Sequence, residues 1–512
     1  MSALPGIAAG IYILVALLGT RVSTPLGLAL TRISAVTALV FSLVGIAGVM
    51  SGASMTGPLI GIGGWGFASR IDPLSVSLFF VIALVGLLVT EFSRNYLSGN
   101  PRQRQFMSSL ALTIATAIVV TTAGNLGQLL IGWVAMSLTL HQLLIFFSDR
   151  PRARAAAHKK FVVARLGDLA LTVAFVKLWL VYGTADIAEL LLAARSGIGS
   201  ELFDTGVPLA APLIALAALL KSAQFPTHGW LTEVMETPTP VSALLHAGIV
   251  NAGGFLIIRF ADIMVLSPSS MQLLIIVGGI TAVFGSLVMA TQTTIKEALG
   301  YSTVAQMGFM LVQAGFGAFS AAGLHLVAHA FYKAHSFLAS GNAVSGVRNA
   351  MVDHHNPRPR MRTVLSGFAL MMAVYAGVCW LFAASAAGNV AVQALGAIFM
   401  MGLFVFAVRS SSMPGLLPRV AVIALFAGVL YFTLQLAAAA FFAPLLPEFA
   451  PSSALDRGIA ATLVVAFALV TLFQLMPPAN SAQWYRRVYV HFKNGLYANA
   501  VFSRLTGAMQ RD

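Results

Sequence analysis

Two groups of lysine and histidine side chains lie within long apolar segments, where ionisable groups are rare. Lys221 and His246 occupy two successive apolar runs, and His325, His329 and Lys333 follow one another at four-residue intervals. Residues four apart share one face of a helix. A charged side chain at mid-bilayer depth costs on the order of 3 kcal/mol unless it is paired or hydrated. These five residues therefore indicate an ion path, and no catalytic residue is predicted on this chain.

The chain between the first two of these residues is expected to interrupt regular helix. Pro226, Pro238 and Pro240 each lack a backbone donor. A broken span frees backbone carbonyls, and it usually persists where they line a cavity or a hydrated path. We therefore predict broken helices near residues 221–240.

Further ionisable residues are candidates for gating or supporting roles. Arg165 and Asp168 are three apart on one predicted helix, so we expect them to pair with each other. Glu233 and Glu236 either gate the cytoplasmic end of the path or cap helices. The full set of supporting candidates is His141, Arg165, Asp168, His228, Glu233 and Glu236.

Other roles compete for the same side chains. Snorkelling to the interface is the alternative for Lys221 and Lys333, but both lie well inside their apolar runs. Interhelical hydrogen bonding is the alternative for His325 and His329. Two histidines four apart could also bind a metal, yet no HExxH pattern and no carboxylate accompany them, so no metal site is predicted.

The elements that must hold these residues are membrane helices. The chain has 512 residues, 58% hydrophobic and 9% charged, whereas roughly a quarter of an ordinary soluble domain is charged. Apolar runs of about 20 residues, the length that spans a bilayer as helix, recur throughout. A barrel is rejected because no alternating segments of about ten residues are found. The predicted fold is an all-α integral membrane bundle of about fifteen transmembrane helices.

The helices are predicted to form one transmembrane unit over residues 1–476, followed by a basic tail over 477–512. The tail is either an interfacial helix on anionic headgroups or a docking helix for a partner. The predicted spans are 5–20, 33–51, 74–91, 107–123, 126–147, 162–182, 208–225, 240–260, 271–290, 298–317, 320–346, 363–386, 391–408, 420–443 and 458–476.

The distribution of charge predicts the orientation. A net charge of +14 would suggest nucleic acid for a soluble protein. Here most of the Lys and Arg fall in alternate connectors and in the tail, so we expect no nucleic-acid partner. The positive-inside rule then predicts an outer N-terminus and a cytoplasmic C-terminus in the cell (inner) membrane. The single cysteine, Cys379, offers no disulfide or thiolate cluster.

One motif of soluble enzymes is present by coincidence. Gly61, Gly63 and Gly66 satisfy the GxGxxG pattern of dinucleotide-binding folds. We expect no strand before it and no βαβ unit around it, so this interpretation is rejected.

Three stretches, in order along the chain, carry a family resemblance: KSAQFPTHGWLTEVMETPTPVSALLHAG, IKEALGYSTVAQMGFM and HLVAHAFYKAHSFLASG. Over roughly residues 70–350 the chain resembles the proton-translocating, antiporter-like subunits of respiratory complex I and Mrp antiporters. The resemblance implies an antiporter-like fold in which Lys221 is the central lysine of a broken helix. It also implies that His325, His329 and Lys333 continue a polar axis along the membrane midplane, and that Arg165 and Asp168 fall on an NRxGD-like pattern.

Two departures from the family pattern set this chain apart. Val134 stands where the family has a glutamate that pairs with the central lysine, and residues 363–408 contain no Lys or Glu to serve as the exit lysine. We therefore expect a shorter ion circuit. Within the family the chain is most similar to the membrane subunits of DAB inorganic carbon pumps.

That similarity implies a partner and a function. A DabA-type protein, similar to a zinc β-carbonic anhydrase, is expected on the cytoplasmic face, with the zinc on the partner and no cofactor on this chain. Inward flow of H⁺ or Na⁺ would drive CO₂ hydration there and accumulate bicarbonate. The alternatives are an antiporter-like subunit of a respiratory or hydrogenase complex, a Na⁺/H⁺ antiporter, or a purely structural anchor.

Overall fold

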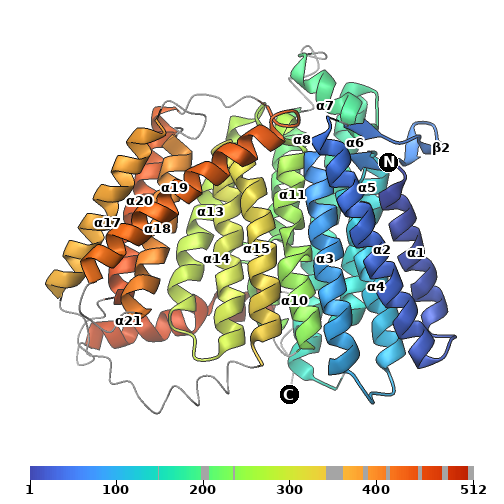
Figure 1. The fold of residues 1–512 in the computed structure, drawn as a ribbon, viewed down its shortest axis with the longest axis horizontal. Helices are drawn as coiled ribbons and strands as arrows, with labels where there is room; N and C mark the ends of the chain where they lie inside the picture. The colour runs from blue at the N-terminus through green and yellow to red at the C-terminus, as the bar shows by residue number, and fades with distance from the viewer. Residues whose placement is uncertain are drawn as a thin grey trace.

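Long helices standing side by side make up almost all of the protein (Figure 1). The computed structural model describes residues 1–52, 54–147, 149–197, 207–234, 237–341, 361–383, 390–410, 416–447, 453–475 and 483–505. The predicted all-α membrane class is confirmed. Glu236 and the ends of the basic tail lie outside the described residues.

The first six helices occupy one side of the bundle. They are α1 (Leu4–Gly19), α2 (Thr24–Met50), α3 (Pro73–Tyr96), α4 (Gln103–Thr121), α5 (Leu126–Leu144) and α6 (Pro151–Tyr182). Local signals fix several ends: the Asp72 side chain caps α3 at Ser75 N, and α6 stops at Gly183, whose φ of +70° suits glycine.

The centre of the bundle holds the broken helices. α8 (Val207–Lys221) ends at the predicted lysine, and the short α9 (Gly229–Glu233) follows after seven residues outside regular helix. The next span is also interrupted, into α10 (Thr239–Ala247), η3 (Ile249–Asn251), α11 (Ala252–Arg259) and α12 (Ala261–Met264). The break near 221–240 was predicted, but the second interruption, directly after His246, was not.

Three unbroken helices complete the centre, and four more form the far side. The central ones are α13 (Pro268–Met289), α14 (Ile295–Gly315) and α15 (Phe319–Ala339). The far side comprises α17 (Met361–Leu381), α18 (Val390–Ser410), α19 (Leu416–Phe442) and α20 (Ala454–Leu475). The amphipathic α21 (Gln483–Lys493) lies across the lower edge of the bundle in Figure 1, and it is followed by η5 (Gly495–Tyr497) and α22 (Ala498–Leu505).

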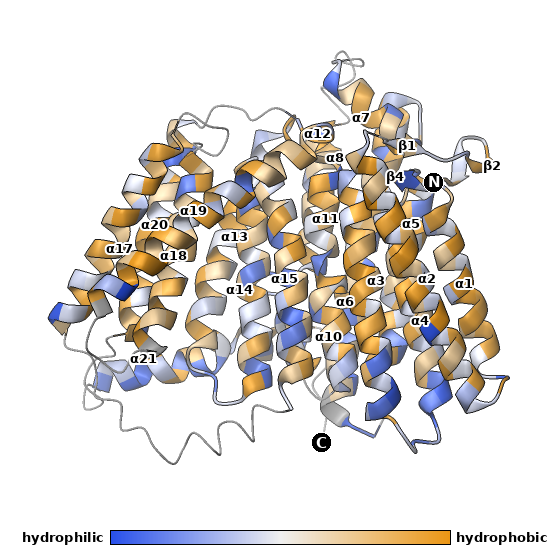
Figure 2. Ribbon diagram, viewed as in Figure 1, coloured by the Kyte–Doolittle hydropathy of each residue, from blue (hydrophilic) through white to orange (hydrophobic). Residues whose placement is uncertain are grey.

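The hydropathy and length of the helices indicate which of them can cross a membrane. Within the described residues ten helical segments are long and apolar enough to cross a bilayer, and α1 and α8 are shorter apolar helices. Figure 2 shows hydrophobic residues along most of the helix lengths and hydrophilic residues gathered along α21. α6, α14 and α15 are equally long but more polar, and they carry many of the predicted ionisable residues.

The connector between α2 and α3 contains strands, which the sequence interpretation had ruled out. β2 (Ile60–Ile62) pairs antiparallel with β3 (Trp65–Phe67), and β1 (Met55–Thr56) pairs with β4 (Arg70–Ile71). The GxGxxG glycines form this hairpin, because Gly63 and Gly64 adopt the positive φ that its turn requires. The expectation of no strand was wrong, but the motif is a hairpin and not a βαβ unit.

Candidate ion path

Lys221 is the last residue of α8, and its ammonium group lies inside the bundle. Its side chain is buried, and Nζ lies 4.4 Å from the centroid of the Trp133 ring on α5. Among the described residues Nζ has no hydrogen-bond partner. A buried cation held by an aromatic face without a direct carboxylate contact is a costly arrangement, which favours hydration or exchange of its proton.

The carboxylate that acts electrostatically on Lys221 belongs to α6. Asp168 is buried and forms an ion pair of 2.6 Å with Arg165, as predicted from their spacing. The charge of Asp168 also acts on Lys221, and so does that of Arg165, with the opposite sign. Val134, at the family's glutamate position, is half-buried. An acid on the sixth helix therefore stands closest in role to the missing glutamate of the fifth.

His246 and Lys333 form a second group between α10, α14 and α15. The His246 ring stacks on Phe337 at 4.3 Å between centroids, and Nδ1 lies 2.9 Å from the Thr303 hydroxyl. Lys333 Nζ donates to the Leu299 carbonyl at 3.0 Å and to the Ser302 hydroxyl at 2.9 Å. The ionisable side chains of His246 and Lys333 are both completely buried, and their hydrogen-bond partners come from α14.

His325 and His329 extend this second group along α15. His325 Nδ1 lies 2.7 Å from Gln313 Oε1, and the two imidazole rings are 6.1 Å apart. His329 is buried without a hydrogen-bond partner among the described residues. His335, off this stripe by sequence spacing, is exposed. The predicted shared face of α15 is thus the buried one.

His228 and Glu233 lie near α9, toward the edge that carries α21. The His228 ring is buried against Phe284, at 4.9 Å between centroids, and against Tyr301 at 6.0 Å. Glu233 Oε2 accepts from Lys159 Nζ at 2.5 Å, and Glu233 Oε1 accepts from Asn499 of α22. Glu233 therefore connects α9 with α6 and α22 at the lower edge.

Two buried lysines of α6 were missed by the sequence analysis. Lys159 and Lys160 were assigned to a charged connector, because the span was predicted to begin at residue 162. The helix begins at Pro151 instead, and only 2% of Lys159 and 5% of Lys160 is exposed. A signal was present, because both lysines directly precede the apolar run of the same helix, where a regular connector would need turn residues.

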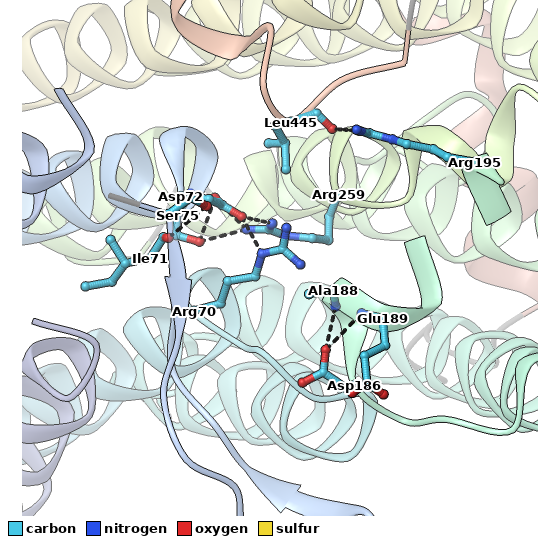
Figure 3. A network of polar contacts seen from close by, with 11 residues as sticks. Arg70, Ile71, Asp72, Ser75, Asp186, Ala188, Glu189, Arg195, Arg259 and Leu445 are labelled. Carbon is cyan, nitrogen blue, oxygen red and sulfur yellow. Dashed lines mark hydrogen bonds and ion pairs between the residues drawn. The ribbon is translucent and has the colours of Figure 1, made fainter. Parts of the chain in front are cut away.

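The upper edge holds a second unforeseen cluster, centred on Asp72 (Figure 3). Arg259 and Arg70 both pair with its carboxylate, and Arg259 also donates to the Ser75 hydroxyl at 2.8 Å. Burial alone would raise the pKa of Asp72, but the two guanidinium groups outweigh it and hold that pKa well below its usual range. Neither Arg70 nor Arg259 was among the candidates that the sequence analysis singled out.

Within the described residues no group of three or more His, Cys, Asp or Glu is placed to hold a metal. The described contacts arrange the predicted path residues in two groups: Lys221 with Asp168, and His246 with His325, His329 and Lys333. His141 lies apart from both, half-buried on α5 with its ring 5.7 Å from that of Phe161.

Comparison with known proteins supplies the family. Residues 123–416, more than half of the chain, match the model of the transmembrane region of NADH:quinone oxidoreductase and Mrp antiporter subunits. The chain belongs to this family. Residues 64–107 also match the model of the N-terminal region of complex I chain 5. The resemblance inferred from three sequence motifs is confirmed.

Curated relatives divide between two kinds of complex. The chain is 43% identical over 283 residues to the probable inorganic carbon transporter subunit DabB of Hydrogenovibrio crunogenus, covering 55% of this chain and 54% of that protein. It is 39% identical to subunit DabB2 of Halothiobacillus neapolitanus, over 58% and 53% of the two chains. The chloroplast NAD(P)H-quinone oxidoreductase subunit 5 of Ceratophyllum demersum is 37% identical over 54% and 38%. The matches span about half the length of the inorganic carbon subunits.

Solved structures share the fold. The Mrp complex of a Dietzia species aligns over 98% of this chain and 56% of that one with a TM-score of 0.59 and 22% identity. The archaeal membrane-bound sulfane sulfur reductase aligns over 99% of both chains with a TM-score of 0.59 and 19% identity. At these identities the likeness concerns the architecture alone.

Proposed function

We propose that this chain is the cation-conducting membrane subunit of an energy-coupled inorganic carbon pump. H⁺ or Na⁺ flows inward along Lys221, His246, His325, His329 and Lys333, and the flow drives CO₂ hydration in a zinc partner of DabA type on the cytoplasmic face. Bicarbonate then accumulates inside the cell. The identity of 39–43% to subunits named for inorganic carbon transport is the observation that carries this proposal.

The buried ionisable groups support conduction as the role of this subunit. A passive anchor would have no use for buried ionisable side chains that lack a hydrogen-bond partner among the described residues, such as Lys221 and His329, because each destabilises the fold. A proton-motive force of about 100–200 mV supplies roughly 2.3–4.6 kcal/mol per charge. That is enough to shift a reversible hydration by well over tenfold in favour of bicarbonate.

The arrangement of the lower edge supports a cytoplasmic docking side. α21 and α22 carry Arg486, Arg487, Lys493 and Arg504, and the basic start of α6 belongs to the same edge. Under the positive-inside rule this edge faces the cytoplasm, where the partner would bind.

The test replaces the central lysine. In cells that also carry the partner, Lys221→Met should abolish growth at low CO₂ and lower bicarbonate uptake at least tenfold, because the side chain can no longer hold a proton. Lys177→Met is the matched control, since Lys177 lies half-buried near the upper end of α6. Wild-type uptake by the Lys221 variant would contradict the proposal.

The second candidate is an antiporter-like subunit of a respiratory or hydrogenase complex, or a Na⁺/H⁺ antiporter. The quinone oxidoreductase relatives favour it. It predicts quinone-coupled pumping or Na⁺/H⁺ exchange in vesicles. Co-purification followed by zinc analysis separates the two, because only the carbon pump requires a zinc protein of carbonic-anhydrase type.

A further inference from the structure

Lys160 is a buried lysine that lines the same internal cavity as Lys221. It stands on α6, and its Nζ donates to the Ser137 carbonyl of α5 at 2.5 Å and to the Ser137 hydroxyl at 2.9 Å. The side chain is 5% exposed. No carboxylate forms a salt bridge with it among the described residues. An ammonium group has three N–H donors, and Ser137 supplies acceptors for two of them, so the third has no acceptor among these contacts.

A cavity joins this lysine to Lys221. It is lined by residues of α5, α6 and α8 together with Trp230 and Ile249, and both Lys160 and Lys221 belong to the lining. Its volume of about 20 Å³ suffices for a single water, which needs about 10–15 Å³. A single water in this cavity would be enough to connect the two lysine side chains for proton transfer.

The path continues from Lys160 toward the lower edge. His141 lies one helical turn beyond Ser137 on α5, half-buried, and its charge and that of Lys160 act on each other. His158, at the start of α6, acts on His141 as well. An imidazole at this position can accept a proton from water at the edge of the bundle and pass it on.

The charges around Lys160 favour transfer of its proton over a permanently protonated amine. Lys221 and Arg165 repel its positive charge, and Asp168 attracts it. Two positive charges on lysines that line one small cavity destabilise each other, so a single proton shared between Lys160 and Lys221 is the favoured state.

We propose that Lys160 is a proton-relay residue between His141 and Lys221, and that the ion carried through this subunit is therefore H⁺. In each cycle protonated Lys160 gives one proton through the cavity water to the neutral amine of Lys221. It then regains a proton from His141, which is recharged from the solvent at the lower edge. The relay rests on the proposed ion-conducting function and names its ion.

Three substitutions at one position separate a relay from other roles. Lys160→Gln keeps a hydrogen-bond donor for Ser137 but cannot carry a proton. Lys160→Arg keeps the positive charge, but its guanidinium group does not release a proton. Both should lower the initial rate of CO₂-dependent proton influx at least tenfold. Lys160→His should regain part of the rate, with the midpoint of the rate–pH profile moved toward acid. The measurement uses the purified complex with its partner in liposomes loaded with a pH-sensitive dye.

The controls address folding and the position of the lysine. All variants must co-purify with the partner as wild type does, and Ser137→Ala gives a milder second variant with an expected loss of a few fold. Lys177→Met removes a half-buried lysine of the same helix that does not line the cavity, and it should keep at least half of the rate. A Lys177→Met loss as large as that of Lys160→Gln would overturn the relay.

The remaining outcomes are equally decisive. A wild-type rate in Lys160→Gln or in Lys160→Arg would overturn the relay, and so would a Lys160→His variant no faster than Lys160→Gln. Lys221→Met in the same assay tells the two proposals apart. If that variant is inactive while Lys160→Gln is normal, only the relay fails; if Lys221→Met is normal, the proposed function fails.

Discussion

The two sides of the bundle use the membrane differently. From α3 to α15, buried side chains include Lys160, Lys221, His246 and Lys333 within one large apolar core. From α17 to α20, the buried polar side chains among the described residues are Gln435 and Thr471, and the core is otherwise apolar and aromatic. Both sides contain long apolar helices. The presence of helices therefore does not locate function, whereas the buried charge does.

The contrast has an energetic basis. Each buried ionisable group destabilises the first side unless partners such as Ser137, Ser302 or Asp168 compensate it. The described part of the second side has no buried ionisable group of this kind, so helix packing and lipid contact suffice to stabilise it. We infer that the first side conducts and that the second supports it.

The largest expected effect comes from breaking the buried pair at the upper edge. Arg259→Met leaves the Asp72 carboxylate buried with Arg70 as its remaining ion-pair partner among the described residues, and it should lower the free energy of unfolding by about 3–5 kcal/mol. Thermal unfolding of the purified protein in detergent measures this loss.

The double variant Arg259→Met/Asp72→Asn is the control for that experiment. It should recover part of the lost stability, because the unpaired carboxylate is gone. Equal stability of the single variant and the wild type would mean that this network does not hold the first side together.

Acid should weaken the same network in the unsubstituted protein. The folded-state pKa of Asp72 lies below its ordinary value, so its contribution is fully present above about pH 4 and is lost as the pH falls below that value. Unfolding curves recorded from pH 6 downward should show this loss, and Asp72→Asn should flatten it. A protein equally stable at every pH in this range would contradict the assignment.

The proposed path along α15 gives a smaller effect, on transport and not on folding. His329→Ala should lower bicarbonate uptake on the order of tenfold, equivalent to about 1.4 kcal/mol in the barrier, because a protonatable ring is removed. His335→Ala is the matched control on the same helix, since that ring is exposed. Equal uptake by the two variants would leave His329 with a packing role only.

The sequence predicted the helices well, because apolar length and proline position are local properties. It also found the shared face of His325, His329 and Lys333, which four-residue spacing determines. It missed Lys160 because a charged stretch before an apolar run looks like a connector, although that stretch continues the helix into the protein interior. It missed the Asp72–Arg259 pair because the two residues are 187 positions apart, and only tertiary packing brings them together.

The smallest effect is expected on the supporting side. The Tyr375 hydroxyl of α17 donates to the Gln393 carbonyl of α18 at 2.7 Å, and Tyr375→Phe removes this hydrogen bond while keeping the ring. Stability should fall by about 1 kcal/mol, the usual contribution of one such bond. Uptake should stay within twofold of wild type, because no residue of the proposed ion path is changed. A transport loss comparable to that of His329→Ala would show that α17 and α18 also carry the ion, and the division of the bundle into a conducting and a supporting side would have to be abandoned.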